Sequence, residues 1–137
     1  MNNLETLVPP LGLCKQIPEG AFADSVFEWN THGKTDGSAE LQVKASDKWR
    51  YGFYFPAPTL AEILEALPTR IMGRDNCRFY LRLCDFRLVP QGYWQIGYAH
   101  TSPRGFVFAE GQHRHDQTNP ATAALRLWLG VNGDVKE

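Results

Sequence analysis

The chain has 137 residues, 43% of them hydrophobic, and its 14 basic and 15 acidic side chains give a formal net charge of −1 at pH 7. This length suffices for one hydrophobic core, so we expect a single domain over residues 1–137. No run approaches the roughly 20 apolar residues of a membrane-spanning helix. A sequence pI near 6.4 disfavours general nucleic-acid binding, which usually goes with a domain pI above about 9.

The first residues and the cysteine content favour a cytoplasmic protein. The segment ahead of Lys15 has no basic stretch before its apolar residues and is interrupted by Pro9 and Pro10, which is not typical of a signal peptide. The three cysteines form an odd set in a chain that is long enough to fold without disulfides. We therefore expect free thiols and a cytoplasmic location.

Residues 1–48 read as an irregular, strand-containing N-terminal segment. Prolines and glycines separate short apolar pieces, and the stretch NTHGKTDGS at residues 30–38 predicts a loose hairpin whose turn is Asp36-Gly37. Phe22 and Trp29 are too apolar for a free arm. We expect this segment to pack on a sheet formed by the α+β core, residues 49–131.

The core begins with a strand and a short helix. Trp49, Tyr51, Phe53 and Phe55 alternate with other residues, a period of two that predicts a strand with an aromatic face. The sequence TLAE starting at Thr59 is a capping box, in which a threonine and a glutamate satisfy free backbone N–H groups at a helix start. We predict a helix over about residues 60–67.

A three-strand antiparallel meander is predicted over about residues 78–110. Its strands alternate apolar and polar residues, and proline and glycine mark turns at residues 89–92 and 102–105. The apolar phase changes near Cys84 and Asp85, which predicts a bulge or bend there. The stretch QHRHD at residues 112–116 reads as a polar loop.

The last predicted element is a helix over about residues 120–130. Asn119 is a good N-cap residue, Pro120 suits the first helical position, and Gly130 is placed for a left-handed C-terminal cap. The element order indicates the α+β class: a layered sandwich in which an antiparallel sheet is packed by two helices.

Two stretches of the sequence resemble known groups of proteins. PAPTLAEILEALP at residues 56–68 resembles a motif of small uncharacterised proteins of gut bacterial genomes and their prophages. The C-terminal pattern N-P-A-x-A-A-L-x-L-W-L is similar to the end of that group and of phage-type α/β sandwich domains. The resemblance spans about residues 56–130 and implies a bacterial or phage setting, but it brings no activity, ligand or functional residue.

A second resemblance concerns topology alone. Helix, three antiparallel strands, helix is also the element order of double-stranded RNA-binding domains, which place lysines at the start of the last helix. Residues 118–122 contain no lysine, so this comparison does not favour duplex RNA.

The sequence does not supply the full set of residues that a metal site or a catalytic cysteine needs. His113, His115 and Asp116 could share a metal ion, but no further ligand stands at a diagnostic spacing, so we expect no metal and no cofactor. Cys77 and Cys84 do not form a C-x-x-C motif and read as buried thiols. A nucleophilic cysteine would also need a base such as His100 within hydrogen-bond reach.

One face of the predicted meander is the candidate binding surface. Alternation directs one set of residues to the helices: Phe79, Leu81, Leu83, Trp94, Ile96, Tyr98, Phe106 and Phe108. The other face then carries the backbone of Gly97 and five candidate binding residues: Arg78, Tyr80, Arg82, Tyr93 and Gln95. Arginine and tyrosine are enriched where proteins meet partners, and they also stack on unpaired bases. We expect the N-terminal segment to cover this face.

These observations favour a non-catalytic protein-interaction or binding module with a protein partner. Two alternatives stay open: a small enzyme with a His/Cys or His/Asp site, and a single-stranded nucleic-acid binder. The second would bring four arginines onto one face: Arg70, Arg74, Arg78 and Arg82. The identity of the partner and the oligomeric state do not follow from the sequence.

Overall fold

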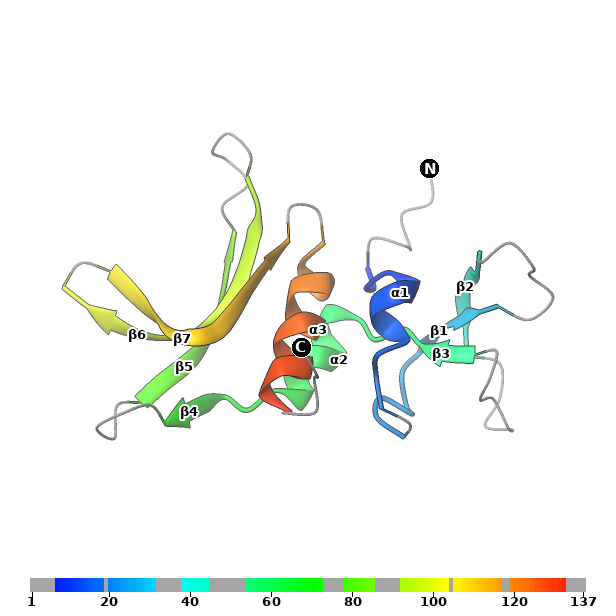
Figure 1. The fold of residues 1–137 in the computed structure, drawn as a ribbon, viewed down its shortest axis with the longest axis horizontal. Coiled ribbons are helices and arrows are strands. Elements are labelled where there is room, and N and C mark those ends of the chain that lie inside the picture. Colours follow the sequence, from blue (N-terminus) through cyan, green and yellow to red (C-terminus); the bar gives the residue numbers. More distant parts are fainter. Residues whose placement is uncertain are drawn as a thin grey trace.

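The computed structural model describes residues 7–18, 20–31, 38–44, 54–72, 78–85, 92–103, 105–116 and 119–132. Helices and antiparallel strands are both present in these ranges, which confirms the α+β class (Figure 1). The elements in chain order are α1 (Leu11–Cys14), β1 (Phe27–Asn30), β2 (Glu40–Val43), β3 (Tyr54–Pro56), α2 (Leu60–Ala66), β4 (Arg70–Met72), β5 (Arg78–Asp85), β6 (Trp94–Ser102), β7 (Gly105–Asp116) and α3 (Pro120–Val131).

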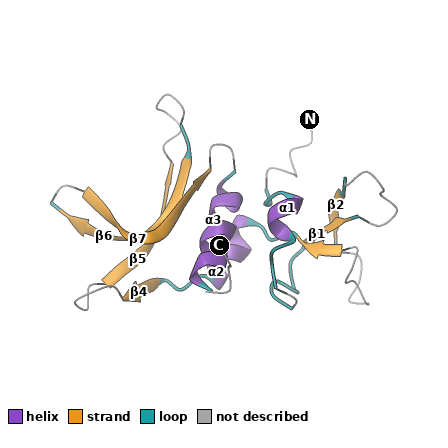
Figure 2. Cartoon of the chain, in the orientation of Figure 1, coloured by secondary structure: helices purple, strands orange, loops and turns teal. Residues whose placement is uncertain are grey.

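The strands form two antiparallel sheets, with the helices between them (Figure 2). The smaller sheet has the order β2-β1-β3 and the larger sheet has the order β4-β5-β6-β7. The pairing of β5, β6 and β7 confirms the predicted meander, and the pairing of β1 with β2 confirms the hairpin. Strand β4, which pairs with β5, is not predicted by the sequence pattern. The predicted turn residues 32–37 and 89–91, and residues 49–53 of the predicted first core strand, lie outside the described residues.

Helix α3 lies at the centre of the fold. It packs against β6 and β7 of the larger sheet, against α2, and against α1 (Figure 1). A helix that is apolar around its whole circumference is typically buried on every side. The buried residues of α3 are Ala121, Thr122, Ala123, Ala124, Leu125, Leu127, Trp128 and Leu129. None of the described helices is long and apolar enough to span a bilayer.

The N-terminal segment packs on α3. The ring of Phe22 lies 4.8 Å from that of Trp128, measured between centroids, and Val8 is fully buried. The expectation that this segment covers the face bearing Arg78, Tyr80 and Arg82 does not hold, because all three are exposed. The physical reason is that α3 has a second apolar side, on which the apolar residues of the segment are buried more favourably than on a face carrying arginines.

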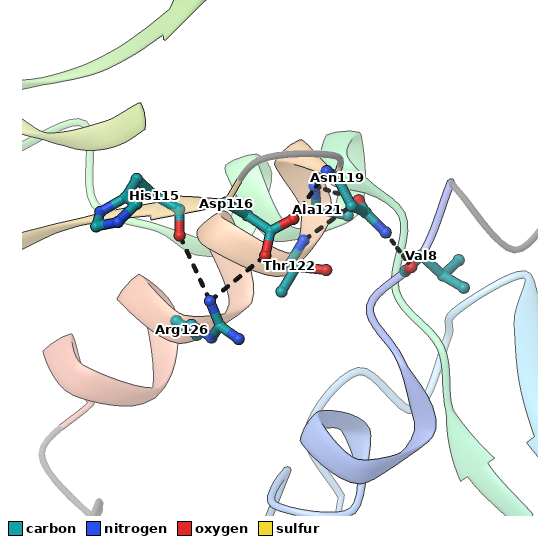
Figure 3. Close-up of polar contacts among 7 residues, drawn as sticks. All are labelled: Val8, His115, Asp116, Asn119, Ala121, Thr122 and Arg126. Carbon is teal, nitrogen blue, oxygen red and sulfur yellow. Dashed lines mark hydrogen bonds and ion pairs between the residues drawn. The ribbon is translucent and has the colours of Figure 1, made fainter. Parts of the chain in front are cut away.

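Asn119 connects three parts of the chain (Figure 3). Its side-chain oxygen accepts hydrogen bonds from the backbone N–H groups of Ala121 at 2.8 Å and Thr122 at 3.3 Å, which confirms the predicted N-cap. Its amide nitrogen donates to the carbonyl oxygen of Val8 at 2.7 Å. Asp116, the last residue of β7, accepts from the backbone N–H of Asn119 at 2.9 Å. One buried side chain thus joins the start of α3 to the N-terminal segment.

The end of α3 differs from the prediction. The helix continues through Gly130 to Val131, and the C-cap residue Asn132 has a right-handed conformation with φ −79°. A Cβ atom at position 130 would lie 2.8 Å from Nη2 of Arg114. Glycine at this position therefore provides room for the Arg114 side chain rather than a left-handed cap.

A bulge in β7 changes which side chains share a face. Gly97 lies opposite His113 and Ala99 lies opposite Phe108, so residues 109–112 stand opposite Tyr98 alone. Four residues opposite one leave three extra residues in β7. Because side chains change face at every residue, an odd number of extra residues reverses the alternation. Phe108, predicted to face the helices, consequently shares a face with Ala99.

Two further predictions for the meander have different outcomes. The described part of β5 has no bulge at Cys84 and Asp85, since it pairs regularly with β6 as far as Asp85; residues 86–91 lie outside the described residues. The hydrogen bonds of a regular ladder hold this end of β5 in register. The side chain of Phe106 lies outside the described part of β7.

Replacing Asn119 should destabilise the protein more than the loss of a helix cap alone. Asn119→Ala removes two accepted bonds and one donated bond, and we expect a loss of about 2 kcal/mol in the free energy of unfolding. Asn119→Ser keeps a cap acceptor but cannot reach Val8, so it should lose about half as much. Urea unfolding measures both values. Equal losses in the two variants would contradict a separate contribution from the Val8 bond.

The capping box of α2 gives a second stability prediction. The Thr59 hydroxyl accepts from the N–H of Glu62 at 3.3 Å, and the Glu62 carboxylate accepts from the N–H groups of Thr59 at 2.9 Å and Val26 at 3.1 Å. We expect Thr59→Ala to cost about 1 kcal/mol, and Glu62→Ala about 2 kcal/mol because two donors lose their partner. Glu65→Ala, at an exposed position of the same helix, is the control. A Glu62→Ala variant as stable as the control would disprove the bridge to Val26.

Candidate functional site

The candidate site is the outer face of the larger sheet, meaning the side that points away from α3. Residues directly opposite each other on antiparallel strands share a face, so the strand register assigns the members. They are Arg70, Met72, Arg78, Tyr80, Arg82, Cys84, Gln95, Gly97, Ala99, Phe108, His113 and His115. Tyr93, just before β6, joins them through its contact with His115.

All five binding residues predicted from the sequence lie on this outer face. Arg78, Tyr80 and Arg82 occupy alternate positions of β5 and are exposed. Gln95 lies opposite Cys84 on β6, and the ring centroid of Tyr93 is 5.5 Å from that of His115. The structure therefore brings the predicted residues together, and the pairing of β4 with β5 adds Arg70 and Met72 to them.

Two histidines belong to the outer face as well. The prediction of a polar loop at residues 112–116 is wrong, because these residues are part of β7. His113 lies opposite Gly97, its Nδ1 is 3.4 Å from the amide nitrogen of Gln95, and its ring centroid is 5.5 Å from that of Phe108. His115 lies opposite Gln95. Imidazole, phenol and phenyl rings thus stand side by side across β6 and β7.

The same alternation separates the residues that could have shared a metal ion. His113 and His115 point to the outer face, whereas Asp116 lies opposite Trp94 on the α3 side. There its carboxylate is 3.5 Å from the guanidinium of Arg126 (Figure 3). Within the described ranges, no group of three or more His, Cys, Asp and Glu side chains could hold a metal ion.

The described cysteines and histidines are not arranged as a catalytic dyad. Cys84 and His115 lie in one row across the sheet with Gln95 between them, so their backbones are roughly 10 Å apart at the usual strand spacing. A nucleophile and its base lie within about 3.2 Å of each other. His100 lies on the α3 side, 5.2 Å from the ring of Phe79. Cys77 is outside the described residues.

The Cys84 thiol is also poorly suited to nucleophilic chemistry. Burial raises its pKa, and the positive charge of Arg82 offsets part of that rise. A thiol whose pKa is raised carries less of the reactive thiolate at neutral pH. Cys84 is consequently a weak nucleophile in the folded protein.

The outer face carries positive charge. Its described ionisable side chains are three arginines, two histidines, two tyrosines and Cys84, and none of them is a carboxylate. The β6–β7 hairpin bends, and the concave side of the sheet is the one that faces away from α3 (Figure 1). Arg70, Arg78 and Arg82 share this face with the aromatic rings.

Comparison with known proteins adds no relative: no family model, no curated protein and no solved structure matches this chain. The resemblance to proteins of gut bacteria and prophages stays a prediction.

Sequence reasoning missed Phe108, His113 and His115 as members of the outer face, and it placed Arg70 on one face with Arg78 and Arg82 only under the nucleic-acid alternative. Arg70 had a weak local signal, because Arg70 and Met72 flank the β-branched Ile71, a pattern compatible with a short strand. The members from β7 had no such signal, since their face depends on the bulge opposite Tyr98.

The two described cysteines should differ in reactivity. Cys14 is fully buried, and burial raises its pKa to about 12, so the folded protein should keep this thiol protonated at pH 8. Cys84 is partly exposed and should be alkylated first by iodoacetamide, as peptide mass mapping would show. Cys84→Ser is the control, which should leave Cys14 unmodified until the protein unfolds. Modification of Cys14 at the rate of Cys84 would contradict the buried position.

Proposed function

We propose that this protein is a non-catalytic binding module and that the outer face of the larger sheet contacts its partner. The observation that carries the proposal is the exposure of Arg78, Tyr80 and Arg82 in one row of β5. Arginine and tyrosine dominate the binding energy of many interfaces. An uncovered row of them on a sheet suits recognition of a partner.

The scaffold behind this face supports the proposal. On the α3 side, Ile96 and Tyr98 are fully buried, and the Tyr98 hydroxyl donates to the carbonyl oxygen of Pro68 at 2.7 Å. Burial raises the pKa of Tyr98 to about 12, which keeps this hydroxyl a donor. Ile96 and Tyr98 thereby fix β6 in the core, and a surface that is already ordered loses less conformational entropy on binding.

The setting is part of the same proposal. The free state of Cys14 and Cys84 among the described cysteines agrees with a cytoplasmic location. The bacterial or phage origin is supported by the sequence resemblance at residues 56–68. The enzyme alternative has less support, since neither His113 nor His115 has a described thiol or carboxylate as a partner in hydrogen-bond range.

The proposal can be tested before the partner is identified. Labelled protein is applied to a peptide array and to an oligonucleotide array, and the Arg78→Ala, Tyr80→Ala double variant is compared with Arg126→Ala, which removes an exposed arginine of α3. We expect the double variant to lose about tenfold or more in signal for the ligands that the wild type binds. The control should keep them.

Melting curves accompany this comparison. Substitutions at exposed positions should change stability by no more than about 0.5 kcal/mol, so a loss of binding would not reflect unfolding. Ligands held equally by the wild type and the double variant would place the binding surface elsewhere and contradict the proposal.

A further inference from the structure

The arginines of the outer face come from two strands. A nucleic-acid binder is expected to bring onto one face the four arginines of residues 70–82, namely Arg70, Arg74, Arg78 and Arg82. Arg78 and Arg82 share a face of β5, and Arg70 on β4 lies opposite Tyr80 on that same face. Arg74 is outside the described residues. Three of the four arginines therefore surround one exposed tyrosine.

The described charged side chains of this face are positive, whereas the net charge of the whole chain is negative. The formal net charge of the chain is −1, but the described carboxylates lie away from the outer face. They belong to Asp24, Glu28, Glu40, Glu62, Glu65 and Asp116. The side chains of Arg70 and Arg78 make no hydrogen bond or ion pair with any described residue. Charge complementarity thus favours an anionic partner at this face.

Aromatic rings accompany the arginines. Tyr80 is 41% exposed, and it stands between Arg78 and Arg82 along β5. Tyr93, Phe108 and the two histidines extend the set across β6 and β7. Unpaired bases stack on such rings and on guanidinium planes, while basic side chains follow the phosphates.

We propose that the outer face binds single-stranded nucleic acid, with a base stacked on Tyr80 and phosphates contacted by Arg70 and Arg78. This inference rests on the proposed function and names its partner class. A duplex would present phosphates to the arginines but would hide the faces of its bases from the rings. An acidic peptide would likewise use the arginines without using the rings. A single strand alone engages both kinds of side chain.

The test is a fluorescence anisotropy titration of the full chain. The probes are labelled 12-nucleotide strands of oligo-uridine and oligo-deoxythymidine, a labelled duplex of equal length, and a labelled peptide of 12 glutamates. We expect both single strands to bind at 50 mM NaCl more tightly than the duplex and the peptide. A difference between the two single strands would identify RNA or DNA as the preferred source.

Salt dependence tests the role of the arginines. Removal of one phosphate contact should reduce the slope of log affinity against log salt by about 0.7 for a single strand. Arg70→Ala with Arg78→Ala should therefore reduce the slope by about 1.4. Lys15→Ala with Arg126→Ala removes the same charge at exposed positions outside this face. This control pair should leave the slope unchanged.

Substitutions of Tyr80 test the stacking of bases separately from the contribution of charge. Tyr80→Ala should weaken binding of single strands by about fivefold to a hundredfold, and Tyr80→Phe should retain it, because the ring and not the hydroxyl stacks. The melting temperature of each variant shows whether it is folded. Equal losses in Tyr80→Ala and Tyr80→Phe would overturn the stacking role.

The outcomes separate this inference from the proposed function. Absence of single-strand binding at 50 mM NaCl overturns the nucleic-acid inference. If the glutamate peptide binds instead and the Arg70, Arg78 variant loses it, the partner class is wrong while the binding module stands. If the oligonucleotides bind but only the control pair loses them, the outer face is not the binding surface, and both proposals fail.

Discussion

The burial of α3, in which eight residues are buried and Arg126 is exposed, is the constraint on which the rest of the fold depends. A helix with alanines and leucines around its circumference needs a cover on both sides, and β6 and β7 provide only one. The other comes from α2 and from the N-terminal segment, through contacts such as that of Phe22 with Trp128. Because the apolar residues of that segment are used on α3, none of its described residues shields the exposed Arg78, Tyr80 and Arg82 on the outer face.

The bulge in β7 decides the composition of that face. In a regular ladder continued from Gly97 and His113, Phe108 would point toward the helices. Because residues 109–112 all stand opposite Tyr98, Phe108 lies beside His113 instead. The concave side thereby gains an aromatic residue next to the histidines, while Tyr98 still fills the core. A local irregularity of the backbone consequently changes the chemistry of a surface without loss of core packing.

The parts of the fold that follow from the sequence are those fixed by neighbouring residues. Thr59 and Asn119 signal helix starts because their side chains bond to backbone groups within three residues, and the meander follows from alternation. Strand β4 is so short that its sequence pattern is only a weak signal, and it exists through its pairing with β5. The covering of α3 by the N-terminal segment, like the face of His113, depends on contacts between residues distant in sequence. Five of the candidate site residues could therefore be grouped by alternation, and those on β7 could not.

The outer face also shows why composition alone is a poor guide to a ligand of this protein. Ala99 is only 1% exposed although it points away from α3, so the larger side chains around it, among them Phe108 opposite, must pack over it. Side chains that pack on one another are already restricted before a partner arrives, which lowers the entropy cost of binding. Three arginines on this face create a local positive charge that a net charge of −1 does not cancel, because interactions between exposed charges are screened within about 8–10 Å. Under the proposed function, the partner is therefore selected by the side chains within that distance, and on this face they are arginines and aromatic rings.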